Sequence, residues 1–247
     1  MAEFRMKIAG ATGEITSLFS STPNYFSAYK TEEAPDFSIT VHPEDLRFEQ
    51  EELDREAEEE GFRFRVFTDP FLERAAIQRA FAEHLIRKNV LLVHGSAIAV
   101  DGIAYLFVAK SGTGKSTHTR FWRELFGQRA VMVNDDKPFL EFTDHGVIVH
   151  GSPWSGKHGL DTNIAVSLGG ICMLERGVEN VVSPVAADIA ASVLQKQTYI
   201  PSDPEYSHCA YELLTMLSQS VPLWHITCTK DPEAARIAYQ GITGKEY

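Results

Sequence analysis

Cysteines are scarce in this sequence, and their spacing matches no metal-binding or redox motif. There are three in 247 residues, and no two of them form a Cys-x-x-Cys pair. An odd number without such pairs argues against a disulfide framework and against a zinc knuckle, and it favours a reducing compartment. We expect the cysteines to be small apolar residues of the core.

Long apolar runs and excess positive charge are also missing. No uninterrupted apolar stretch is long enough to span a bilayer, and the N-terminus lacks the apolar region of a signal peptide, so we expect a cytoplasmic protein. The 23 Lys and Arg residues are outnumbered by 34 Asp and Glu, which gives a formal charge of −11. Proteins that bind nucleic acids or anionic membranes usually carry an excess of Lys and Arg, so neither is an expected partner.

What the sequence does contain is a candidate phosphate-binding loop. It comprises Ala109, Lys110, Ser111, Gly112, Thr113, Gly114, Lys115 and Ser116. The pattern is Gly-x-x-x-x-Gly-Lys-Ser/Thr, with Ala109 in place of the first glycine. In such loops the backbone N–H groups surround a phosphate, the lysine reaches the β- and γ-phosphates, and the hydroxyl holds Mg²⁺.

The flanking sequence supports this interpretation. Residues 103–108 are apolar and β-rich, as expected for a buried strand, and residues 115–126 have helical spacing without Pro or Gly. A helix that begins at the loop adds the partial positive charge of its N-terminus to the phosphate site. We therefore expect residues 109–117, with Thr117 the last, to bind a nucleotide.

A second candidate group is the pair Asp135 and Asp136. It follows residues 130–134, an apolar run typical of a buried strand. Of two adjacent carboxylates, one can hold Mg²⁺ while the other takes the proton from an attacking hydroxyl. We assign Asp135 as the base and Asp136 as the metal ligand, although the two roles could be exchanged.

The remaining pattern predicts an α/β fold with a mixed, partly antiparallel sheet and flanking helices. Residues 90–100 read as one strand, which pairs through the Asp101-Gly102 turn with the strand that enters the loop. Residues 62–67 alternate in the manner of a half-exposed strand. Asp69-Pro70 is a typical helix start, so we place a boundary between a small α+β segment, 1–68, and a catalytic domain, 69–247.

Several segments resemble the HPr kinase/phosphorylase and phosphoenolpyruvate carboxykinase superfamily. The shared features are His94-Gly95, the loop 111–116 and the acidic pair. The segments 116–122, 134–138 and 151–157 are more similar to the smaller HPr-kinase-like proteins of bacteria. The glutamate- and arginine-containing signature of HPr kinases is absent, which disfavours HPr as a substrate, and the chain is too short for a carboxykinase.

This resemblance implies a phosphoenolpyruvate-carboxykinase-like P-loop core. It also implies that Lys115 and the loop amides bind the β/γ-phosphates, that Ser116 and one aspartate hold Mg²⁺, and that His94 lies near the reaction centre. Lys157, in a glycine-rich stretch that predicts a loop, is a candidate for a further positive charge on the transferred phosphoryl group. An exposed lysine without a function is the alternative.

Together these features predict an ATP- and Mg²⁺-dependent kinase. Its acceptor is a hydroxyl of a protein or peptide serine or of a small molecule, and the sequence does not choose between them. Two alternatives stay open: a nucleotide-binding sensor without transfer activity, and a bifunctional kinase/phosphorylase. The related kinases form hexamers, so a homo-oligomer is also an expectation.

Overall fold

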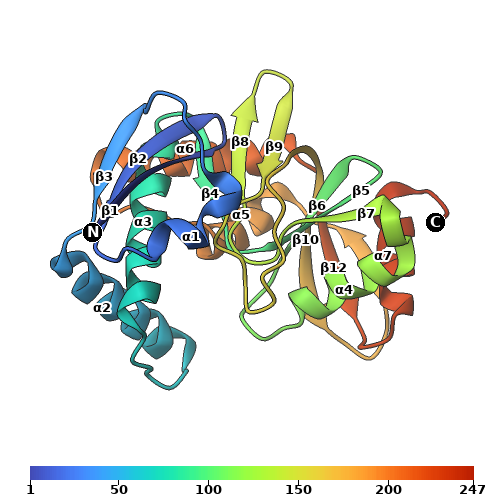
Figure 1. Cartoon of the computed structure of the whole chain (residues 1–247). Coiled ribbons are helices and arrows are strands. Elements are labelled where there is room, and N and C mark those ends of the chain that lie inside the picture. Colours follow the sequence, from blue (N-terminus) through green and yellow to red (C-terminus); the bar gives the residue numbers. More distant parts are fainter. The chain divides into compact units, whose positions relative to one another are not determined.

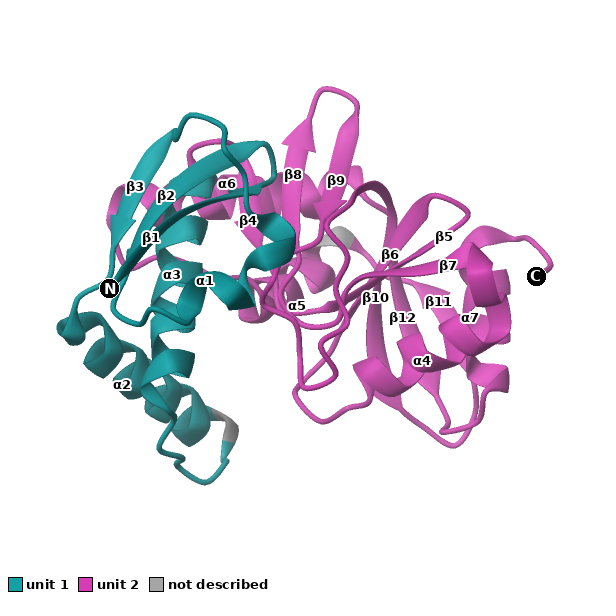
Figure 2. Cartoon of the chain, viewed as in Figure 1, with its two compact units in different colours: residues 1–85 teal, residues 86–247 magenta. Residues whose placement is uncertain are grey.

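In the computed structural model, the chain forms two sheets that belong to separate units, Met1–Leu85 and Ile86–Tyr247 (Figures 1 and 2). Backbone and side chains are described for residues 1–59, 61–186 and 188–247. Within these ranges, none of the helices combines the length and apolar character that crossing a membrane requires.

The first unit is a small sheet packed with two long helices. The sheet has the order β1-β2-β3, with β1 and β2 antiparallel and β2 and β3 parallel. Its elements are β1 (Ala2–Ile8), β2 (Ala11–Ser17), α1 (Thr22–Tyr25), β3 (Phe37–Thr40), α2 (Pro43–Glu60) and α3 (Asp69–Ile86).

Helix α3 packs within this first unit, which moves the boundary later than the predicted 68/69. The Phe81 ring lies 5.0 Å from that of Phe37 on β3. The fully buried Glu73 carboxylate accepts hydrogen bonds from the Leu18 N–H and the Thr22 hydroxyl. These contacts with β3 and with the chain after β2 make the helix part of the N-terminal unit.

The second unit is built on a mixed sheet, which has nine strands in the described part of the chain. Its strands are β4 (Val90–Leu92), β5 (Ser96–Val100), β6 (Ile103–Val108), β7 (Ala130–Asn134), β8 (Phe139–Thr143), β9 (Gly146–His150), β10 (Ala165–Arg176), β11 (Val181–Pro184) and β12 (Leu223–Cys228). Its helices are α4 (Lys115–Phe126), α5 (Ala187–Gln197), α6 (Pro204–Ser220) and α7 (Glu233–Thr243). This confirms the mixed α/β class and the hairpin through Asp101-Gly102, in which β5 and β6 are antiparallel.

The pairing brings the carboxyl ends of several strands to one edge. β10 runs parallel to β6 and to β12. β5 is antiparallel to both β6 and β7, so β7 runs in the same direction as β6. The segments after β6, β7 and β10 therefore emerge at the same edge, where ligands bind in open α/β sheets.

Helices cover both faces of this sheet. Successive side chains of a strand point to opposite faces, so β6 contributes to both cores. On β6, Leu106 and Val108 belong to the core that α5 and α6 cover. Tyr105 and Phe107 belong to the core formed with α4 and α7. Both cores are fixed to the same strand, which gives the loop after β6 a rigid base.

Two sequence predictions are wrong in detail. The run 90–100 is two strands rather than one: β4 pairs with β8, β5 pairs with β6 and β7, and His94-Gly95 lies between them. The segment 62–67 is not a strand. There the Gln50 side chain bonds to the Arg65 carbonyl and the Phe67 N–H, at 2.8 and 3.0 Å, so a side-chain amide occupies part of that backbone edge.

Trp122 should be a main source of stability in the second unit. It is fully buried on α4, with its ring 5.2 Å from Phe107 and 5.7 Å from Tyr239, and its Nε1 donates to His118. Trp122→Ala should lower the free energy of unfolding by about 3–5 kcal/mol, measured by urea denaturation followed by circular dichroism. Glu124→Ala, an exposed change on the same helix, should stay within about 0.5 kcal/mol of wild type; equal losses would contradict this packing.

Candidate functional site

The candidate phosphate-binding loop, residues 109–116 and called the phosphate loop below, lies between β6 and α4, as the sequence predicts. Gly112 and Gly114 have φ of +77° and +126°, and a Cβ at either position would meet no atom within 4 Å. Glycine is therefore required by backbone conformation and not by space. The N–H groups of Thr117 and His118 already bond to the Gly114 carbonyl, which starts the helix directly at the loop.

Lys115 is held at the base of the loop. Its side chain is buried, and Nζ donates to the Ala109 carbonyl at 2.9 Å. Ser116 and Thr117 follow in the first turn of α4, and both are exposed. The lysine thus has a neutral partner, while the hydroxyls of the first turn face solvent.

Asn134 organises the acidic turn, which we define as residues 134–137 after β7. It is fully buried, and its Oδ1 accepts the N–H groups of Asp136 and Lys137 at 2.8 and 2.6 Å. Its Nδ2 donates to the Ser152 carbonyl at 2.8 Å. One side chain therefore fixes the acidic turn and also ties it to the glycine loop, residues 152–159.

The glycine loop is fastened to the acidic turn at further points. The Ser152 hydroxyl donates to the Lys137 carbonyl at 2.6 Å, and the Gly156 N–H donates to Asp135 Oδ1 at 2.6 Å. Trp154 is buried, with its ring 6.2 Å from that of Phe139, so it packs under the loop. A Cβ on Gly151 would lie 1.9 Å from the Thr162 carbonyl oxygen, so only glycine fits where the loop begins.

Asp135 presents a buried carboxylate oxygen with no partner. The residue is 4% exposed, and among the described residues Oδ2 accepts no hydrogen bond. Burial raises the pKa of the Asp135 carboxyl, and the hydrogen bond from Gly156 opposes this in part. A buried acceptor without a donor is costly, which marks Oδ2 as a position for a proton or for a ligand that carries one.

Asp136 and His94 form a pair next to the phosphate loop. His94 Nε2 lies 3.3 Å from Asp136 Oδ1. Burial, followed by the charges of Lys137 and Lys115, lowers the pKa of His94, so the imidazole is neutral. Burial raises the pKa of Asp136, while Lys137 and Lys115 act to lower it. Lys115, His94 and Asp136 are thus electrostatically coupled.

Lys157 lies on an exposed turn of the glycine loop. None of the contacts described for the chain joins it to the acidic turn. The neighbouring side chain that acts electrostatically to lower the pKa of Asp135 is His158. The part expected of Lys157 stays a prediction.

Oxygen donors for a divalent cation are few. Within residues 1–59, 61–186 and 188–247, no three His, Cys, Asp or Glu side chains are grouped so that they could hold a metal ion. Ser116 and Asp136 offer a hydroxyl and a carboxylate, which suit Mg²⁺. That ion usually keeps several waters and takes one or two carboxylates plus phosphate oxygens, so a small protein donor set fits it.

Arg176, which the sequence reasoning missed, supports the phosphate loop from β10. Its Nε donates to the Thr113 carbonyl at 2.8 Å, and its Nη2 donates to the Gly112 carbonyl. Arg176 and the phosphate loop are far apart in sequence, so no local pattern indicates this contact. The one indication in the sequence is that Arg176 is a basic residue at the end of a strand.

Comparisons with known proteins give no family assignment. No protein-family model matches the chain, and no curated protein matches it. Among solved structures, the HPr(Ser) kinase/phosphatase from Coxiella burnetii is similar at 9% sequence identity and a TM-score of 0.33. The similarity covers 56% of this chain and 85% of that chain.

Removing the Asp135 charge should stabilise the protein. Because the folded pKa of Asp135 lies above its ordinary value of 3.8, ionisation costs stability as pH rises through and above that value. Asp135→Asn should therefore unfold at higher urea concentration than wild type at pH 7, and the difference should shrink toward about pH 4. The exposed Asp144→Asn should show no such trend, and a gain for Asp135→Asn that grows on acidification would refute the expectation.

The Arg176 contacts should restrain the phosphate loop. Arg176→Met removes both hydrogen bonds to loop carbonyls and should speed amide hydrogen exchange in residues 110–117 by about tenfold, since two such bonds contribute at least about 1.4 kcal/mol. Mass-spectrometric exchange would measure this. Arg120→Met, which removes an exposed ion pair with Glu124 on α4, is the matched control. Equal exchange in the two variants would exclude a restraining role for Arg176.

Proposed function

We propose that the protein is an ATP- and Mg²⁺-dependent kinase that transfers the γ-phosphoryl group to a hydroxyl. The observation that carries this proposal is the unpartnered, buried Oδ2 of Asp135 beside a second carboxylate, at the sheet edge that also bears the phosphate loop. Phosphoryl transfer needs a positioned donor, neutralised phosphate charge and an acceptor for the hydroxyl proton. In this proposal the phosphate loop positions the donor, Lys115 and a Mg²⁺ ion on Asp136 neutralise the phosphate charge, and Asp135 accepts the proton.

The donor's phosphates would bind to the amides of the phosphate loop and to Lys115. Lys115 Nζ donates to the Ala109 carbonyl, and a phosphate oxygen would offer it a stronger hydrogen bond, because both partners would then be charged. The first turn of α4 adds N–H groups and the positive end of the helix.

Ser116 and Asp136 would hold Mg²⁺. When bound, the ion neutralises the charge that develops on the phosphate oxygens. Asp136 suits this role, because the charge of Lys115 acts to lower its pKa, whereas Asp135 Oδ1 already accepts the Gly156 N–H. His94, neutral and 3.3 Å from Asp136 Oδ1, would orient this carboxylate through its Nε2–H.

Asp135 would accept the proton of the attacking hydroxyl at Oδ2. The Gly156 N–H holds the other oxygen, so the carboxylate keeps one orientation. A raised pKa makes the carboxylate a stronger base, provided that it is ionised at the working pH. Lys157, on the same glycine loop, would approach the transferred phosphoryl group or the acceptor.

The acceptor belongs to one of two classes, a protein or peptide serine or a small hydroxyl compound. The glycine loop lies against the acidic turn, so the acceptor would enter beside residues 152–159. The same site run in reverse would make a phosphorylase. A sensor without transfer activity has no use for a buried base, which is why we favour the kinase.

Labelled ATP tests this directly. With γ-phosphate-labelled ATP, Mg²⁺ and extract from the source cell, wild type should transfer label to a macromolecule or a metabolite. Asp135→Asn should reduce the rate by at least about 100-fold while ATP still binds. Lys115→Met should weaken ATP binding by about 10- to 100-fold, because a charged hydrogen-bond donor is lost.

Exposed charges remote from the site supply the controls. Asp144→Asn and Lys245→Met should transfer label at the wild-type rate. Tight ATP binding by wild type with no labelled acceptor would favour the sensor. Release of label from an identified product on addition of orthophosphate would add the phosphorylase activity.

A further inference from the structure

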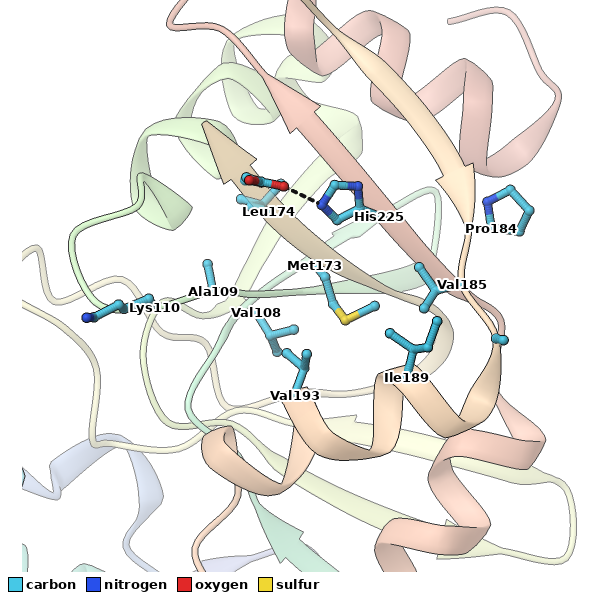
Figure 3. Close-up of a pocket in the computed structure, with 12 residues that line it drawn as sticks. Val108, Ala109, Lys110, Met173, Leu174, Pro184, Val185, Ile189, Val193 and His225 are labelled. Atoms are coloured by element: carbon cyan, nitrogen blue, oxygen red, sulfur yellow. Dashed lines mark hydrogen bonds and ion pairs between the residues drawn. The ribbon is translucent and has the colours of Figure 1, made fainter. Parts of the chain in front are cut away.

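An apolar pocket lies beside the phosphate loop, between the carboxyl half of β10 and α5 (Figure 3). Its volume is about 420 Å³, within the range of small-molecule sites. Figure 3 shows Met173, Val185, Ile189 and Val193 around it. Aliphatic walls of this kind suit a flat, weakly polar group.

The pocket is continuous with the phosphate loop. Ala109 and Lys110 belong to the loop and also line the pocket. A neighbouring hollow of about 490 Å³ is lined by residues 110–113 and by Leu174, Glu175 and Arg176. The two hollows share Lys110, Leu174 and Glu175, so they adjoin one another on the path from the tip of the loop to the aliphatic walls.

The strand order gives this path a direction. The acidic turn follows β7, which is separated from β6 by β5, whereas the pocket lies on the opposite side of β6, at β10. A nucleotide whose terminal phosphate faces the acidic turn extends its other end away from it. From the phosphate loop, that direction leads toward β10.

We propose that this pocket binds the base of the phosphoryl-donor nucleotide. The assignment rests on the proposed function, since it takes the phosphates to lie in the phosphate loop. The faces of a nucleobase are apolar and its edges carry donors and acceptors. Glu175 and His225 also line the pocket, with Glu175 Oε2 and His225 Nε2 2.9 Å apart, and they offer both kinds of partner to those edges.

Ile189→Asp tests the pocket without disturbing the core. Ile189 is 59% exposed, so the change leaves packing intact while it puts a carboxylate in the apolar wall. Ser192→Asp is the matched control: it adds the same charge on an exposed position of the same helix that does not line the pocket. Calorimetry would measure the affinity of each protein for Mg²⁺-ATP and for Mg²⁺-tripolyphosphate, which has no base.

Ile189→Asp should weaken ATP binding by about tenfold or more, because a base would desolvate the new charge. Tripolyphosphate binding should stay within about twofold of wild type. Tripolyphosphate is more negative than ATP, so general charge repulsion would weaken it at least as much. Ser192→Asp should leave both affinities unchanged.

Two results would overturn the pocket assignment while the proposed function stands: unchanged ATP affinity in Ile189→Asp, or equal weakening of ATP and tripolyphosphate. If wild type binds neither ligand, the proposed function fails, and the pocket assignment fails with it. Photolabelling gives an independent reading on wild type. Azido-ATP should label peptides that contain residues 185–193, and labelling confined to other peptides would also overturn the assignment.

Discussion

The hydrogen bonds of one buried amide, that of Asn134, hold the proposed site together. Its oxygen accepts two N–H groups of the acidic turn, and its nitrogen donates to the glycine loop. Both segments are otherwise irregular, and irregular backbone keeps one conformation only when its polar groups are satisfied. Because both segments are fastened to the end of β7, the two carboxylates and the glycine loop are held in place by the sheet.

That rigidity makes an unfavourable arrangement possible. Asp135 is buried with one oxygen satisfied and the other not, beside a second carboxylate whose pKa burial also raises. Such an arrangement persists only when surrounding contacts define it, as Gly156 and Asn134 do here. A ligand that supplied a proton or a cation to Oδ2 would offset the cost of burying this oxygen.

The sequence was informative where structure is set locally. A loop between an apolar strand and a helix, and a turn at Asp101-Gly102, follow from neighbouring residues, and both are present. The break at His94-Gly95 was hidden because residues on both sides are equally apolar. Residues 62–67 alternate as a strand does, but the Gln50 side chain, and not a neighbouring strand, bonds to their backbone. Long-range contacts, such as those of Arg176 and Asn134, join residues far apart in the chain, so the neighbouring sequence does not predict their partners.

The reversed direction of β5 has a consequence for the site. It lies between two strands that run the other way, so its beginning lies at the edge where theirs end. The residues just before it, His94 and Gly95, are therefore delivered to the phosphate loop from upstream in the chain, and the Gly95 N–H donates to the Asp136 carbonyl. In an all-parallel sheet every approach to that edge comes from a strand's end. Because β5 runs opposite to β6 and β7, residues that precede one strand and residues that follow the other two come together at the proposed site.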